Sequence, residues 1–137
     1  MKPTLIPYLN FNGNAREAMT FYQSVLGGEL NIQSFADAGM AKNLEDGSRT
    51  MHATLKNDLI SFMASDGMPG KDVVFGDNVH MNVVGSDEAL LTGFFNKLLE
   101  GGKVDMSLAR QFWGDTFGMV TDKFGVHWMV NISSQNN

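Results

Sequence analysis

The stretch FWGDTFGMVTDKFGVHWMVNI, residues 112–132, decides the fold of this chain. We interpret residues 116–122 and 126–132 as two strands. Between them, DKFG at 122–125 combines an aspartate with a glycine, the residue types that a tight turn favours. The stretch therefore predicts an antiparallel hairpin.

The second strand of this hairpin alternates between two kinds of side chain. Trp128 and Val130 are apolar, and we expect them to pack on a helix. His127, Met129 and Asn131 then lie on the other face of the sheet, because successive strand residues point to opposite faces. This alternation predicts a sheet with one face free for a ligand.

The order of predicted elements occurs twice along the chain. Sliding the sequence along itself superimposes three identical pairs of residues, which are Phe21 and Phe95, Gly27 and Gly101, and Gly28 and Gly102. Each half is predicted to contain a strand, a helix and three further strands. The expected strands are 4–11, 29–35, 51–55 and 59–64 in the first half, and 79–84, 104–108, 116–122 and 126–132 in the second.

This repeat predicts an α+β fold of two βαβββ modules, whose sheets together form a curved mixed sheet around a cavity. The first module covers about 1–66, the linker about 67–77 and the second module about 78–133, all within one domain. Residues 36–49 are polar and are expected to be irregular.

The first helix has recognisable ends. Asn14, with Glu17 three residues later, predicts a capping box at its start. Gly27 and Gly28 supply the left-handed cap at its end. Apolar residues recur at helical spacing on the face expected to be buried, namely Ala15, Ala18, Met19, Tyr22, Val25 and Leu26.

Composition excludes several classes of protein. The chain has 137 residues, 43% hydrophobic and 18% charged, which is typical of a globular domain. It has no cysteine, which excludes disulfides, thiolate metal sites and cysteine nucleophiles. The net charge of −5 comes without any run of lysine or arginine, so no nucleic-acid partner is expected. No signal peptide or membrane span is visible, and we expect a cytoplasmic protein with no membrane partner.

Three stretches resemble the PhnB-like branch of the vicinal oxygen chelate superfamily, which includes glyoxalase I, bleomycin-resistance proteins and extradiol dioxygenases. They are FWGDTFGMVTDKFGVHWMVNI at 112–132, PYLNFNGNAREAMTFYQSVLGG at 7–28 and FMASD at 62–66. The resemblance implies a glyoxalase/bleomycin resistance/dioxygenase-like fold, in which each module curves its sheet around a cavity.

The resemblance also implies four metal-ligand positions, one near the start of each module and one on each last strand. These positions fall near Ile6, Phe62, His80 and Met129 in this sequence. Only His80 could ligate the hard or borderline divalent metals that this family uses. We therefore expect no cofactor. A metal-dependent lyase, isomerase or dioxygenase centred on His80 is the alternative.

A ligand pocket is mostly apolar with a few placed polar groups, and one set of residues fits that description. His80 is the candidate catalytic residue, as a general base or as a hydrogen-bond donor to the ligand. The predicted ligand-binding residues are Tyr8, Asn10, Phe62, His80, Asn82, Trp113, Phe117, His127 and Met129. His52 is expected to have a surface or sheet-face role.

The favoured function is the binding of a small organic molecule in an aromatic cavity, without the usual metal centre. A structural or regulatory module without chemistry of its own is a further hypothesis. Members of this family also carry the label demethylubiquinone methyltransferase, but the glycine-rich cofactor turn of methyltransferases does not occur here. We expect a homodimer, because the superfamily commonly pairs chains and Pro7 is typical of an edge strand.

Overall fold

The computed structural model describes residues 1–68 and 70–134. The chain divides into two compact units, Met1–Val74 and Phe75–Asn137. Each unit is described by itself below. Among the described residues, no helix is both long enough and apolar enough to cross a membrane.

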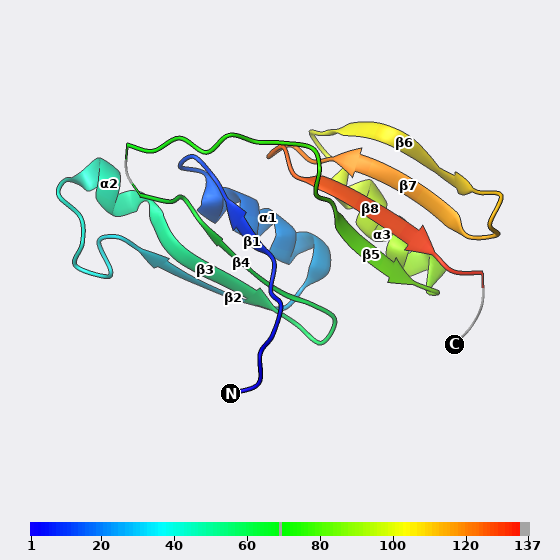
Figure 1. Cartoon of the computed structure of the whole chain (residues 1–137), viewed down its shortest axis with the longest axis horizontal. Helices are drawn as coiled ribbons and strands as arrows, with labels where there is room; N and C mark the ends of the chain where they lie inside the picture. Colours follow the sequence, from blue (N-terminus) through cyan, green and yellow to red (C-terminus); the bar gives the residue numbers. More distant parts are fainter. Residues whose placement is uncertain (69, 135–137) are drawn as a thin grey trace. The chain divides into compact units, whose positions relative to one another are not determined.

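The first unit is a mixed four-stranded sheet with a helix on one face (Figure 1). Its elements are β1 (Tyr8–Asn10), α1 (Ala15–Leu26), β2 (Glu29–Ser34), α2 (Leu44–Ser48), β3 (Thr50–Lys56) and β4 (Ser61–Ser65). The strand order is β1-β4-β3-β2. The β1–β4 pair is parallel, and the other two pairs are antiparallel.

Helix α1 supplies half of the core of this unit. The six residues predicted for its buried face are those that the structure buries. Tyr22 packs edge-on against Phe62 of β4, with ring centroids 5.8 Å apart, and Leu55 of β3 is also fully buried. Burying a side chain of this size contributes roughly 1.5–3 kcal/mol, so this face holds the helix on the sheet.

The start of α1 differs from the prediction. The Asn14 side chain makes no capping hydrogen bond, so the predicted capping box is wrong. Asp66, which follows β4, takes its place: its Oδ1 accepts hydrogen bonds from the N–H groups of Gly13 and Ala15, both at 2.9 Å. A carboxylate satisfies the free N–H groups of a helix start as well as a local cap does.

The second unit repeats this arrangement (Figure 1). Its elements are β5 (Met81–Gly85), α3 (Glu88–Leu98), β6 (Lys103–Arg110), β7 (Thr116–Thr121) and β8 (His127–Ile132). The strand order is β5-β8-β7-β6, and only the β5–β8 pair is parallel. The predicted α+β fold of two βαβββ modules is therefore confirmed. The joint cavity and the single-domain boundaries stay predictions.

Most strand bounds differ from the prediction by one to three residues, and the larger differences occur at two places. The first strand runs only from Tyr8 to Asn10, although a strand was expected over 4–11. Pro3 and Pro7 have no N–H to donate to a sheet, which limits pairing there. Pro7 still contributes its carbonyl oxygen, which accepts from Met63 N at 3.0 Å, and β1 is an edge strand as predicted. The segment 36–49 contains the short helix α2, where irregular structure was expected.

Candidate functional site

Each sheet has one face covered by its helix and one face opposite, here called the helix-free face. In β8, Trp128, Val130 and Ile132 are buried on the helix side. His127 and Met129 alternate with them and lie on the helix-free face, as predicted. The neighbouring strands complete this face in register, with Asn82 beside Met129 and Phe117 beside Asn131.

A chain of hydrogen bonds crosses one end of this face. Thr121 of β7 donates from Oγ1 to Asp105 Oδ2 at 2.5 Å, and the same Oγ1 lies 2.9 Å from His127 Nδ1. The Lys103 Nζ lies 3.6 Å from the other carboxylate oxygen of Asp105. The three groups Asp105, Thr121 and His127, here called the acid–hydroxyl–imidazole chain, come from three adjacent strands.

An irregularity in β6 places Asp105. Val104 pairs with Val120 and Met106 with Met119, so Asp105 is the extra residue of a β-bulge. Bulges re-aim side chains and are common beside functional sites. Nothing in the local sequence indicates this bulge, and neither Asp105 nor Thr121 was among the predicted site residues.

His80 precedes β5 and lies beside His127. Their ring centroids are 5.4 Å apart, with the ring planes inclined at 41°. His80 and His127, both predicted ligand-binding residues, therefore lie side by side in the structure, and their role in binding stays a prediction. His80 is half-buried and Asn82 is exposed.

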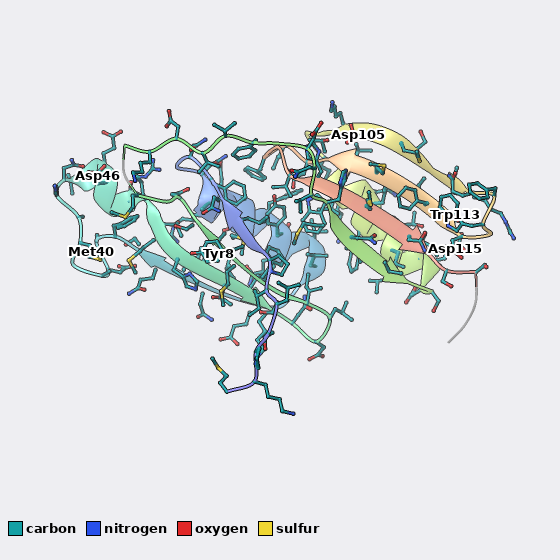
Figure 2. The ribbon with its side chains drawn as sticks, in the orientation of Figure 1. Tyr8, Met40, Asp46, Asp105, Trp113 and Asp115 are labelled. Carbon is teal, nitrogen blue, oxygen red and sulfur yellow. The ribbon has the colours of Figure 1, made fainter. Side chains whose placement is uncertain are left out.

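Aromatic rings gather at the opposite end of the same strands, in the loop between β6 and β7 and at the start of β7. Trp113 lies edge-on to Phe117 with centroids 5.8 Å apart, and Phe112 and Trp113 are also edge-on, with centroids 4.9 Å apart. Trp113 is 48% exposed, which is high for so large a ring. Figure 2 shows Trp113 and Asp115 in this loop and Asp105 at the other end of β6.

Asp115 fixes the base of this loop. Asn131 Nδ2 donates to its Oδ2 at 3.0 Å, and Ser134 N donates to its Oδ1 at 3.2 Å. These two bonds, the Asn131 bond first, hold the pKa of Asp115 below the ordinary value of 3.8, and desolvation opposes them. A lowered pKa means that the interaction stabilises the fold above about pH 3.8 and is lost as the pH falls through the lowered pKa.

Replacing Asn131 should therefore move this titration. In Asn131→Ala the pKa of Asp115 should rise towards 3.8, because the largest stabiliser of the carboxylate is gone. Carboxyl carbon shifts followed by NMR across the acid range would measure it. Asp37 is the internal control, since its own lowered pKa comes first from the backbone N–H of Ser34. An unchanged Asp115 titration would contradict the assignment.

The first unit carries a different polar cluster on its helix-free face. Tyr8 Oη lies 3.1 Å from His52 Nδ1, and Thr54 Oγ1 lies 3.2 Å from His52 Nε2. Tyr8 is 45% exposed and Asn10 is also exposed, and their role in ligand binding stays a prediction. His52, expected only as a surface or sheet-face residue, is thus the centre of this cluster.

Phe62 does not lie where the prediction placed it. It is 1% exposed and packs on Tyr22 of α1, so its expected place in a ligand cavity is wrong. In register it stands opposite Leu55, another core residue. The helix-free face of β4 is formed instead by its neighbours Ser61 and Met63.

Within residues 1–68, the pockets of the first unit include two with assigned lining residues. One of about 480 Å³ is lined by Gly13, Asn14, Arg16, Glu17, Thr20 and Ser48. The other, of about 240 Å³, is lined by Phe35, Met40, Lys42, Asp46 and Met68. Figure 2 shows Met40 and Asp46 at the end of the sheet that carries α2. Neither of these two pockets is lined by a predicted site residue.

Comparisons with known proteins agree with this architecture. A model of the 3-demethylubiquinone-9 3-methyltransferase family matches residues 3–131. The chain belongs to this family. The Escherichia coli protein YjdN is 33% identical over 144 residues, and the match covers 96% of both proteins.

Several solved structures share the fold of this chain. The Pseudomonas aeruginosa protein PA1353 is 38% identical, with a TM-score of 0.87 over 96% of this chain and 98% of its own. A PhnB protein from Bacillus cereus is 27% identical, with a TM-score of 0.79 over 96% of this chain and 100% of its own. A Burkholderia phytofirmans enzyme of the glyoxalase/bleomycin resistance protein/dioxygenase family shares the fold at 11% identity and a TM-score of 0.59, over 91% of this chain and 95% of its own. The resemblance to the PhnB-like branch of that superfamily is confirmed.

The metal centre that the superfamily resemblance implies does not fit this member of the family. Of the four expected positions, Phe62 is in the core, and Ile6 carries no donor atom. Met129 offers only a thioether, which suits soft metals rather than the hard or borderline ones. Within residues 1–68 and 70–134, no group of three or more histidines and carboxylates could hold a metal ion.

Proposed function

We propose that the chain binds a small organic molecule on the helix-free face of its second sheet, without the metal centre usual in the superfamily. The observation that supports this most is the half-exposed Trp113 beside Phe117, at one end of a face whose other end carries polar groups. Aromatic rings give a ligand large contact area at low entropic cost, while a few polar groups fix its orientation.

The dimensions of this face favour an elongated ligand. Phe117 and Thr121 are four residues apart on β7, which corresponds to about 13 Å along the strand. Between the aromatic end and the polar end lie Met119 and Met129, opposite each other in register. Methionine side chains adapt to varied apolar ligands. A flat, largely apolar molecule with one polar end suits this arrangement.

Trp113 is expected to carry much of the affinity. With 4-phenylphenol as the probe, Trp113→Ala should weaken binding roughly tenfold, because an aromatic contact contributes about 0.5–1.5 kcal/mol beyond its buried area. Titration by protein NMR would measure the affinity and locate the binding face. Leu59→Ala, at an exposed apolar residue of the first unit, is the matched control and should change nothing.

Two results would contradict the proposed function. One is binding of 4-phenylphenol that Trp113→Ala leaves unchanged, and the other is no binding of 4-phenylphenol at all.

Elemental analysis of protein purified without chelators tests whether the protein holds a metal ion. A full equivalent of nickel, zinc, iron or manganese would favour the alternative, a metal-dependent enzyme centred on His80. The expected homodimer and the expected cytoplasmic location stay predictions.

A further inference from the structure

Thr121 occupies the middle of the acid–hydroxyl–imidazole chain and has one proton to give. A hydroxyl donates once and accepts through its lone pairs, whereas a carboxylate only accepts. Thr121 Oγ1 donates to Asp105 at 2.5 Å, so its proton is used there. Toward His127 Nδ1, at 2.9 Å, it can therefore only accept.

This count of donors and acceptors determines which ring nitrogen of neutral His127 carries the proton. A neutral imidazole has one N–H and one acceptor nitrogen. If Nδ1 donates to Thr121, Nε2 is the acceptor. No hydrogen bond joins Nε2 to any residue that the structure describes, whereas both ring nitrogens of His52 have partners. His127 alternates with the buried Trp128, so its ring lies on the helix-free face.

We propose that Asp105 and Thr121 are positioning residues that hold His127 in the Nδ1–H tautomer, so that its Nε2 accepts a hydrogen bond from a ligand hydroxyl or N–H group. The proposal rests on the proposed function and deepens it, because it specifies the polar end of the ligand. A phenol, alcohol or amide N–H fits this position. An ether of the same shape leaves Nε2 without a donor.

Two features around the acid–hydroxyl–imidazole chain hold Asp105 in its place. The bulge in β6 supplies Asp105, and a regular strand pairing would not include this extra residue. Lys103 lies 3.6 Å from the carboxylate and bears the opposite charge. Carboxylate partners that fix an imidazole tautomer through its second nitrogen recur in functional sites.

The tautomer can be measured directly, without any ligand. Nitrogen-15 NMR of histidine-labelled protein at pH 8 should show His127 with its proton on Nδ1. Thr121→Val removes the acceptor and should shift His127 towards the Nε2–H form. Thr121→Ser keeps the hydroxyl and should keep the wild-type spectrum. Thr116→Val, on the same strand but outside the chain, is the matched control.

Ligand selectivity tests the consequence. Wild-type protein should bind 4-phenylphenol about threefold to tenfold more tightly than 4-methoxybiphenyl, the range expected for one hydrogen bond. In Thr121→Val this ratio should fall below about twofold, while Thr121→Ser should retain it.

Each outcome distinguishes this inference from the proposed function. An Nε2–H tautomer in the wild type, or an Nδ1–H tautomer that survives in Thr121→Val, overturns the inference whatever the ligands do. Equal affinities for the two biphenyls also overturn it, while the proposed function stands if Trp113→Ala weakens both. Binding of neither biphenyl contradicts the proposed function and the ligand selectivity together.

Discussion

Asp66→Ala should lower the free energy of unfolding by about 3–5 kcal/mol. The carboxylate is 1% exposed and accepts three backbone hydrogen bonds, from Gly13, Ala15 and Thr50, at 2.8–2.9 Å. Alanine leaves these three N–H groups without an acceptor, those of Ala15 and Thr50 buried and that of Gly13 partly buried. Each buried unsatisfied group costs about 1–3 kcal/mol. Urea unfolding followed by circular dichroism would measure the loss.

A second variant keeps this prediction testable if Asp66→Ala does not fold, since whole domains are stable by only about 5–15 kcal/mol. Asp66→Asn keeps one acceptor oxygen, so its free energy of unfolding should fall by roughly half as much as that of Asp66→Ala. Asp58→Ala, in the exposed turn between β3 and β4, should change stability by less than about 0.5 kcal/mol. A loss of under about 1 kcal/mol in Asp66→Ala would show that its three bonds do not hold the helix start in place.

Two buried aspartates show which hydrogen bonds a sequence can reveal. Asp122 opens the predicted DKFG turn, and its Oδ1 accepts from Phe124 and Val126, two and four residues later. Such local turns are visible in the sequence because all the partners are close neighbours. Asp66 reaches Gly13 across 53 positions, and no local pattern indicates that contact.

The site shows the same division between local and distant information. Alternation placed Tyr8, His127 and Met129 on the correct faces, because strand parity follows from consecutive residues. Phe62 was placed through a family position rather than by parity, and it belongs to the core. The acid–hydroxyl–imidazole chain depends on the register of three strands and on a bulge, neither of which the sequence displays.

Gly102→Ala is the second change with a large expected effect. It should lower the free energy of unfolding by about 3 kcal/mol. A Cβ at Gly102 would overlap the carbonyl oxygen of Thr121 and lie 3.0 Å from Asp122 Cα. Both are backbone atoms at the end of β7 and the start of the turn that follows it, so no side-chain rotation can relieve the clash. Gly28 has the equivalent place in the first unit, where a Cβ would lie 2.6 Å from Lys56 O.

Gly93→Ala is the matched control for this clash and should have the opposite sign. Gly93 lies inside α3, and a Cβ there would meet nothing within 4 Å. Alanine is favoured over glycine within a helix by roughly 0.5–1 kcal/mol, so this variant should unfold at a higher urea concentration than the wild type. If Gly102→Ala proved as stable as Gly93→Ala, the close approach of the β6 start to the end of β7 would be disproved. The register that pairs Lys103 with Thr121, and with it the position of Asp105 beside Thr121, depends on that approach.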